Sequence, residues 1–394
     1  MKFKLIILMF FFGVVSCFAT SNTRYKAWTQ DISNTEISVL TCSPGDEIYS
    51  IFGHTAIRVC NPNIRLDAVV NYGLFDFNQD SFVYRFVKGE TDYMCGVESF
   101  NSFLYSYAWR GSGVKSTTLD LTDTEKERII RVLTNDLKPE NREYRYNFAY
   151  NNCATKIRDI VKFAYNERYE SLLPAEFTFR EIIGRYAENY PWFMFSFDIC
   201  LGGKEYNTLM TPEEVQFLPE HLDVALNNSL INRDGEDIKP NTKEEILIEP
   251  VDKTIESTLF TPVVVASLLL ILSIINLIFG KKCRIASNIY SGSIFFTYTL
   301  IGLLVTFLIF FSEHPFTTWN MNLCIFNPLI IFPFIGLMIK NKGIIFKIVN
   351  VALVLITVLF IVYCLVFWNF TNNAFILLAI TLVLELDKQI IKGA

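Results

Sequence analysis

One stretch decides both the fold and the chemistry expected of this chain: residues 146–161, which read YNFAYNNCATKIRDIV. Apolar residues follow Cys153 at intervals of four, seven, eight and eleven, the spacing of one helix face (Ile157, Ile160, Val161 and Ala164). Asn151 and Asn152 are residue types favoured at a helix N-cap. We therefore expect a helix that begins at Cys153 and directs this cysteine inward.

A cysteine in that position has two interpretations. Cysteine is among the residue types most often buried, which favours simple core packing. A helix N-terminus, however, presents unpaired N–H groups and a partial positive charge, which lower the pKa of a reachable thiol and can stabilise an oxyanion. Cys153 is therefore a candidate nucleophile, provided that the chain brings a base to it.

The candidate base is His54, one of three histidines, in the stretch YSIFGHTAIRV at residues 49–59. Gly53 interrupts the chain before residues 55–59, which predict a strand, so His54 is expected at the mouth of that strand. A hydrogen-bonded structural role is the alternative for this histidine. His221 lies in the turn-like sequence FLPEHL, where a surface role is expected.

The strand expected next, within VVNYGLFDF at residues 69–77, supplies a polar residue to orient the imidazole. Asn71 is preferred, because its side-chain carbonyl can accept an imidazole N–H, and Asp76 is the reserve. Tyr72 and Asn152 are the candidates for lining the pocket or for a hydrogen bond to an oxyanion.

The chain divides into an exported part and a membrane part. Residues 1–19 contain two lysines, a short apolar run and small residues, as in a secretory signal peptide. Cys17 could instead be the lipidated cysteine of a loose lipoprotein box. We expect an exported domain at 20–225, with strands first and helices later, and then a polar linker at 226–257 that acts as a tether.

Residues 258–394 predict an all-α membrane domain. Apolar segments of about the length that crosses a ~30 Å hydrocarbon core lie at 259–280, 289–311, 323–339, 348–368 and 370–386. Lysine and arginine follow the first, third and fifth segments, whereas residues 312–322 and 369–373 contain neither. We therefore expect five spans in the cytoplasmic membrane, with the exported domain on its periplasmic or outer face.

The outer loop between the second and third segments reads SEHPFTTWNMNLCIFNP, residues 312–328. It combines His314, Trp319 and Asn322 near the outer membrane interface. Polar residues beside a span are candidates for binding lipid or substrate, although aromatic residues and asparagines at an interface also serve as anchors.

Composition narrows the chemistry further. The formal net charge of −5 gives no reason to expect a nucleic-acid partner. Three well-separated histidines without a paired CxxC argue against a metal site, and no cofactor is expected. The exported domain has five cysteines, an odd number, so at least one is unpaired in a monomer, and we expect it to be Cys153 (the five are Cys42, Cys60, Cys95, Cys153 and Cys200).

Four stretches carry a resemblance, in this order: SPGDEIYSIFGHTAIRV, VVNYGLFDF, PENREYRYNFAYNNCATKIRD and FLPEHL. They resemble the exported domain of the bacterial lipoprotein N-acyltransferase (Lnb-type) family, formerly a domain of unknown function, over roughly residues 27–225. The resemblance implies an α+β fold of the circularly permuted papain-like kind, related to the NlpC/P60 group. It gives the catalytic places to His54, to Asn71 or Tyr72, and to Cys153.

The resemblance also implies a reaction, the transfer of a fatty acyl chain through a cysteine thioester to the N-terminal amino group of a lipoprotein. Lipoproteins and membrane phospholipid are then the expected partners, and a membrane tether suits a substrate held in the bilayer. Two alternatives stay open. One is a cysteine peptidase or amidase acting on cell-wall peptides, and the other is a non-enzymatic, membrane-anchored binding protein with an inert thiol.

Overall fold

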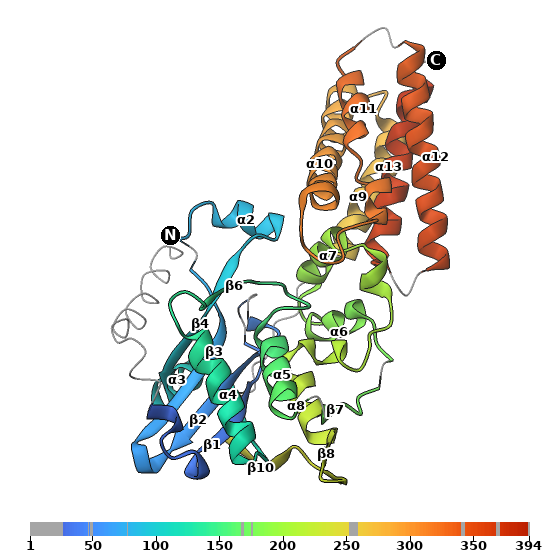
Figure 1. Ribbon diagram of the computed structural model, residues 1–394. Helices are drawn as coiled ribbons and strands as arrows, with labels where there is room; N and C mark the ends of the chain where they lie inside the picture. The colour runs from blue at the N-terminus through green and yellow to red at the C-terminus, as the bar shows by residue number, and fades with distance from the viewer. Residues whose placement is uncertain are drawn as a thin grey trace.

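The computed structural model describes residues 27–45, 47, 50–76, 78–166, 169–174, 176–251, 259–339, 343–367 and 371–392. A domain built on a β-sheet stands beside a bundle of long helices (Figure 1). At the junction α7 (Pro191–Cys200) contacts two helices of the bundle, α9 (Pro262–Phe279) and α10 (Arg284–Phe311). The predicted α+β class is confirmed. The predicted signal segment 1–19, with Cys17, lies outside the described residues.

The main sheet has seven antiparallel strands in the order β10-β5-β1-β2-β3-β4-β6. Its centre is formed by the early part of the chain, where alternating apolar residues predict strands. The strands are β1 (Glu36–Cys42), β2 (His54–Asn61), β3 (Leu66–Leu74), β4 (Asp92–Ser99), β5 (Val114–Leu119), β6 (Glu143–Arg145) and β10 (Asn241–Ile248).

Helices cover both faces of this sheet. On one face α4 (Asp123–Asp136) and α5 (Cys153–Ala164) bury their apolar sides against β2 and β3, while α3 (Phe100–Arg110) packs on the other face. A capping box starts α4, since Thr122 Oγ1 accepts from the Glu125 backbone and the Glu125 carboxylate accepts from the Thr122 backbone. The remaining helices of this domain are α2 (Phe82–Lys88), α6 (Phe179–Tyr186) and α8 (Pro219–Asn228), with 3₁₀ turns at Ala27–Thr29, Ile32–Asn34, Pro62–Ile64, Lys204–Asn207 and Glu214–Phe217.

The expectation of a polar linker at 226–257 is wrong for most of that range, because the chain there forms strands. Strands β8 (Leu230–Arg233) and β9 (Glu236–Ile238) form a small sheet with β7 (Tyr169–Glu170), and β10 pairs with β5 as an edge of the main sheet. The composition is polar because β10 is an edge strand with mostly exposed side chains, and charged residues on such a strand prevent pairing with other chains.

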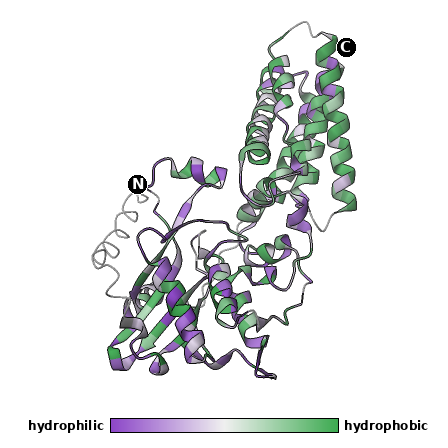
Figure 2. Ribbon diagram, in the orientation of Figure 1, coloured by the Kyte–Doolittle hydropathy of each residue, from purple (hydrophilic) through white to green (hydrophobic). Residues whose placement is uncertain are grey.

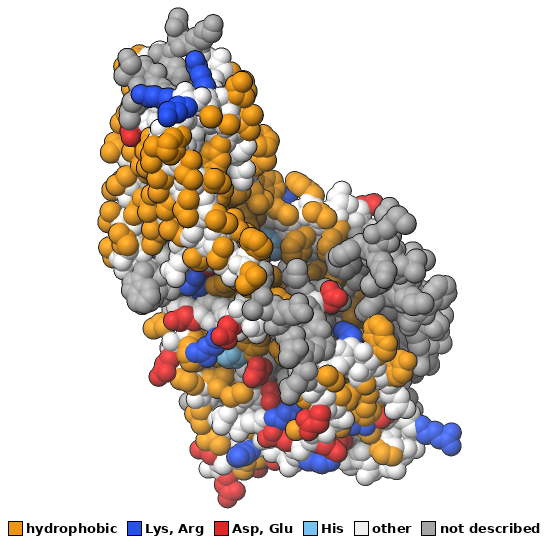
Figure 3. All heavy atoms as spheres, turned by 180° about the vertical axis from the view of Figure 1, so that it is seen from behind, with side chains coloured by type: hydrophobic (Ala, Val, Ile, Leu, Met, Phe, Trp, Pro, Cys, Tyr) orange, Lys and Arg blue, Asp and Glu red, His pale blue; other side chains and the backbone are white. Residues whose placement is uncertain are grey.

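Three of the predicted spans correspond to helices that are long and apolar enough to cross a membrane: α9 (Pro262–Phe279), α10 (Arg284–Phe311) and α12 (Ile344–Val366). Figure 2 shows these helices as mainly hydrophobic, with some hydrophilic residues among them. On the face seen in Figure 3, hydrophobic side chains cover most of the bundle, while charged side chains gather on the sheet domain and at the tip of the bundle far from it. The number of passes stays a prediction.

The third predicted span, 323–339, is not one continuous helix. It is divided into two 3₁₀ turns, Met321–Cys324 and Pro328–Ile330, and the short helix α11 (Ile331–Gly336). Asn327 has an extended backbone and caps the turn that begins at Pro328, which lacks the N–H that a continuous helix needs, and this explains the interruption.

Most of the fifth predicted span, 370–386, falls in α13 (Asn373–Lys392), which carries ionisable residues on its buried side. Glu385 accepts hydrogen bonds from Asn276 of α9 at 3.0 Å and from Ser291 of α10 at 2.5 Å. Lys388 donates to Ser287 of α10 at 2.6 Å. These bonds satisfy the buried charges and fix α13 against α9 and α10.

Candidate active site

Cys153 is the first residue of α5 and is half-buried, as the sequence predicts. Asn152 is the N-cap: its Oδ1 accepts from Thr155 N at 2.9 Å, and its Nδ2 donates to Phe148 O at 2.6 Å and to Phe217 O at 2.8 Å. Both ends of this buried amide are therefore occupied. The expectation that Asn152 binds an oxyanion or lines the pocket is wrong, because the side chain holds the helix start instead.

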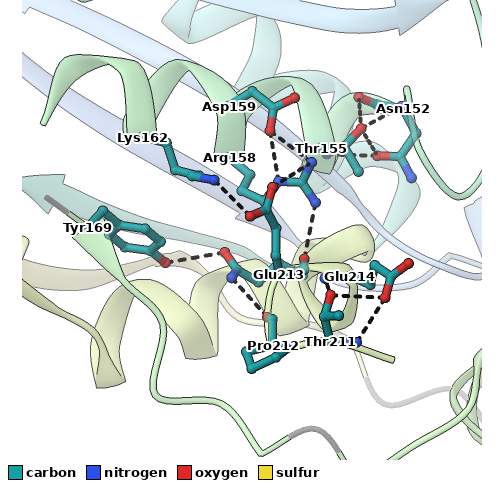
Figure 4. Close-up of polar contacts among 11 residues, drawn as sticks. Asn152, Thr155, Arg158, Asp159, Lys162, Tyr169, Thr211, Pro212, Glu213 and Glu214 are labelled. Atoms are coloured by element: carbon teal, nitrogen blue, oxygen red, sulfur yellow. Dashed lines mark hydrogen bonds and ion pairs between the residues drawn. The ribbon is translucent and has the colours of Figure 1, made fainter. Parts of the chain in front are cut away.

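Further along α5, ion pairs fix the helix to the segment before α8. Arg158 Nη1 donates to Glu213 O at 3.1 Å, and Lys162 Nζ donates to Glu213 Oε2 at 2.7 Å. Figure 4 shows these contacts on the side of α5 that faces residues 211–214. These contacts hold the second and third turns of α5 against the segment before α8.

The structure brings His54 and Asn71 to Cys153. His54 Nε2 donates to Asn71 Oδ1 at 3.1 Å, and the imidazole lies close enough to Cys153 for the two groups to act on each other's pKa. Because Nε2 is engaged by Asn71, Nδ1 is the ring nitrogen that is left to act on the thiol. Asn71 Nδ2 in turn donates to Glu98 Oε1 of β4 at 3.0 Å. Four side chains, from β2, β3, β4 and α5, thus form one chain of polar contacts.

The electrostatics of this group favour a thiolate. Burial acts to raise the pKa of Cys153, but the charge of His54, its hydrogen bond and the backbone N–H groups of Thr55 and Ala154 outweigh burial and lower that pKa. Burial conversely acts to lower the pKa of His54, yet the charge and hydrogen bond of Cys153 raise it overall. Each group therefore stabilises the charged form of the other.

All five cysteines of the exported domain are unpaired, but the pKa values of the four others are shifted in the opposite direction from that of Cys153. Burial raises the pKa of Cys42, of Cys60, of Cys95 to about 12 and of Cys200 to about 11. Of these five thiols, Cys153 alone has a lowered pKa, which is the property required of a nucleophile at neutral pH.

Three residues that the sequence did not single out also lie near the thiol. Gly73 has φ +88°, and a Cβ at this position would lie 3.8 Å from the Cβ of Cys153. Burial raises the pKa values of Tyr144 and Tyr146, and the Cys153 charge contributes to both increases. The glycine after Asn71 and Tyr72 is the only sequence signal that could have indicated a close approach here.

Tyr72 does not join the site. Its ring is 1% exposed, and its hydroxyl donates to Asp136 Oδ2 of α4 at 2.8 Å. Neighbouring residues of a strand point to opposite faces, so Asn71 and Tyr72 cannot both face His54. The expectation of an oxyanion or pocket role for Tyr72 is therefore wrong. The reserve residue Asp76 is exposed, and its carboxylate accepts from Asn78.

The outer loop lies at the junction of the two domains. His314 Nε2 donates to Phe86 O at 2.5 Å, and Asn322 Nδ2 donates to Asp198 O at 2.6 Å, so both side chains hold the loop to the sheet domain. Asn322 is buried, and a substrate-binding role for it is wrong. Trp319 is 83% exposed. His221, for which a surface role is expected, lines a cavity of about 730 Å³ with Tyr186.

Two family models match this chain. That of the Lnb N-terminal periplasmic domain matches residues 24–184, and that of the Lnb transmembrane domain matches residues 254–392. No curated protein and no solved structure matches the chain. The two matches follow one another in the order in which the structure places the sheet domain and the apolar helices, as in an inner-membrane protein with a periplasmic domain. The chain belongs to the Lnb family, that of the Lnb-type lipoprotein N-acyltransferases.

Proposed function

We propose that this protein is an acyltransferase that moves a fatty acyl chain through a thioester on Cys153 to the N-terminal amino group of a lipoprotein. The observation that carries the proposal is the meeting of Cys153, at the start of α5, with His54, whose Nε2 is held by Asn71 Oδ1 at 3.1 Å. Against the effect of burial, the charge of His54 is the main influence that lowers the pKa of Cys153. The side-chain carbonyl of Asn71 accepts a hydrogen bond from Nε2 of the same imidazole. The order of histidine, polar residue and cysteine along the chain is that of a circularly permuted papain-like enzyme, which we propose as the fold type.

In the first half-reaction, the Cys153 thiolate attacks the carbonyl carbon of a lipid ester. The thioester forms as the ester C–O bond breaks, and the leaving alkoxide takes the proton that the His54 imidazolium carries. The backbone N–H groups of Ala154 and Thr55, which lower the pKa of the thiol, are suited to stabilise the oxyanion of the tetrahedral intermediate.

In the second half-reaction, the amine of the lipoprotein's N-terminal cysteine attacks the thioester carbonyl. His54, now neutral, accepts a proton from the attacking amine, the amide forms and the Cys153 thiolate leaves. The thiolate of Cys153 and the protonated imidazole of His54 are thereby restored. The membrane domain would hold the enzyme beside two lipid-anchored reactants, which raises their effective concentration.

The test uses the full chain in nanodiscs with a phospholipid donor labelled in its acyl chains and no acceptor. We expect hydroxylamine-labile label on the peptide that contains Cys153, and its transfer to a lipopeptide added later. Cys153→Ser should lose both, whereas Cys60→Ser, a control at a half-exposed thiol with a raised pKa, should keep both. Transfer that survives Cys153→Ala would refute the proposal, and cleavage of wall peptides without lipid would favour the peptidase alternative.

A further inference from the structure

Helix α2 exposes an apolar surface that the sheet domain does not cover. It reads FVYRFVK, and the exposed fractions are 74% for Val83, 56% for Tyr84 and 45% for Phe86. The two basic side chains of α2 are held in ion pairs, Arg85 with Asp92 and Lys88 with Glu90, and so do not cover this apolar surface. An exposed apolar patch on a domain outside the helical bundle calls for a partner.

The position of α2 indicates that partner. Three contacts fix its last turn to the chain directly after α10: Ser312 Oγ donates to Val87 O at 3.0 Å, Glu313 N donates to Lys88 O at 2.7 Å, and His314 donates to Phe86 O. Gly89 allows this approach, since a Cβ there would lie 2.9 Å from His314 N. The helix is therefore attached at the level where α10 ends.

The end of α10 is itself part of the apolar surface of the bundle. Phe310 and Phe311 are 69% and 61% exposed, and the rings of Tyr84 and Phe307 lie 6.2 Å apart. We propose that α2 inserts its exposed apolar face into the outer leaflet, at the boundary between lipid headgroups and acyl chains. The apolar surface of the spanning helices then continues onto the sheet domain.

This contact goes beyond the proposed function and does not depend on it. It has a consequence for the site, however, because α2 lies in the connection between β3 and β4, which carry Asn71 and Glu98. A membrane contact on α2 would hold the end of β3 that follows Asn71, and the start of β4, towards the bilayer.

The test is photocrosslinking of the full chain in nanodiscs that contain radiolabelled phospholipid. Benzoylphenylalanine replaces Val83, or Phe310 as a positive control, or Tyr105 of α3, which is 75% exposed and so matches Val83 in exposure. We expect labelled lipid on the variants at 83 and 310 and little on the variant at 105. Equal labelling at 83 and 105, or crosslinks from 83 to protein alone, would overturn the proposal.

A second observation concerns the amide of Asn71. A primary amide can turn either end towards a neighbour, and here the Glu98 carboxylate, which can only accept, binds Nδ2 at 3.0 Å. The carbonyl end is thereby left facing the N–H of His54. Burial raises the pKa of Glu98, whereas the hydrogen bonds to Ser102 and Asn71 and the charges of His54 and Arg110 act against this increase and favour the carboxylate. Resting on the proposed function, we infer that Glu98 is a positioning residue that fixes the direction of this amide.

Exchange of the two groups tests the inference. Glu98→Gln can donate to Asn71 and lets its amide turn, while Asn71→Asp sets two carboxylates side by side. The double variant restores one donor and one acceptor between residues 71 and 98, with the total charge kept. We expect each single variant to slow acyl transfer by about tenfold, the effect of about 1.4 kcal/mol, and the double variant to recover most of it.

The pH dependence of Cys153 alkylation by iodoacetamide is the second readout, because it needs neither lipid nor acceptor. The single variants should shift this profile and the double variant should return it towards that of the natural chain. If the rate of acyl transfer in the double variant fell by the product of the two single reductions, the role of Glu98 would be overturned. Single variants with unchanged alkylation profiles would overturn it as well. Normal alkylation without acyl transfer in the natural chain would instead count against the proposed function.

Discussion

Replacement of Asn152 distinguishes a helix cap from an oxyanion donor at the residue before the nucleophile. Asn152→Ser keeps an oxygen to accept from Thr155 N but removes the donors to the carbonyls of Phe148 and Phe217. Each buried carbonyl that loses its donor costs about 1 kcal/mol or more, so the serine variant should lose about 2 kcal/mol. Asn152→Ala also loses the cap, worth about 1 kcal/mol, for a total of about 3 kcal/mol.

Thermal unfolding of the full chain in one fixed detergent, followed by intrinsic fluorescence, measures these losses. For a domain of this size 1 kcal/mol corresponds to roughly 2–4 °C, so the midpoint should fall by about 4–8 °C for serine and about 6–12 °C for alanine. The neighbouring Asn151→Ala is the control, because it removes one exposed hydrogen bond, to Arg145 O, and should change little. An unchanged midpoint in Asn152→Ser together with a loss of turnover would refute the cap and restore the oxyanion role.

Three further results are expected. His54→Gln removes the positive partner that lowers the pKa of Cys153, so thiol alkylation should require a higher pH, and an unchanged profile would contradict the ion pair. Asp198→Ala removes the buried carboxylate that pairs with Arg180 Nε at 2.8 Å and should cost about 3–5 kcal/mol in thermal unfolding, whereas a loss below about 1 kcal/mol would exclude a structural role for this ion pair. Gly73→Ala and Gly235→Ala both place a Cβ at positive φ, at a cost of about 1–2 kcal/mol, but only the first should slow acylation of Cys153, because only the first lies beside it.

The sequence by itself determined the features that depend on short-range interactions. The start of α5 at Cys153 follows from an N-cap asparagine and the apolar residues of the next three turns, and the start of α4 follows from Thr122 and Glu125. The apolarity of α9, α10 and α12 likewise needs only local composition. Such signals are complete within a few turns of chain, so no knowledge of the fold is needed to recognise them.

Only the tertiary structure decided which residues meet. The pairing of β2 with β3 sets Ala56 opposite Asn71 and so brings Asn71 rather than Tyr72 to the side of His54, while Glu98 arrives from a strand that the sequence analysis did not consider. The polar strand β10 became recognisable only through its partner β5. Strand register and buried hydrogen bonds are formed between segments far apart in the chain, and composition within one segment does not specify its partner.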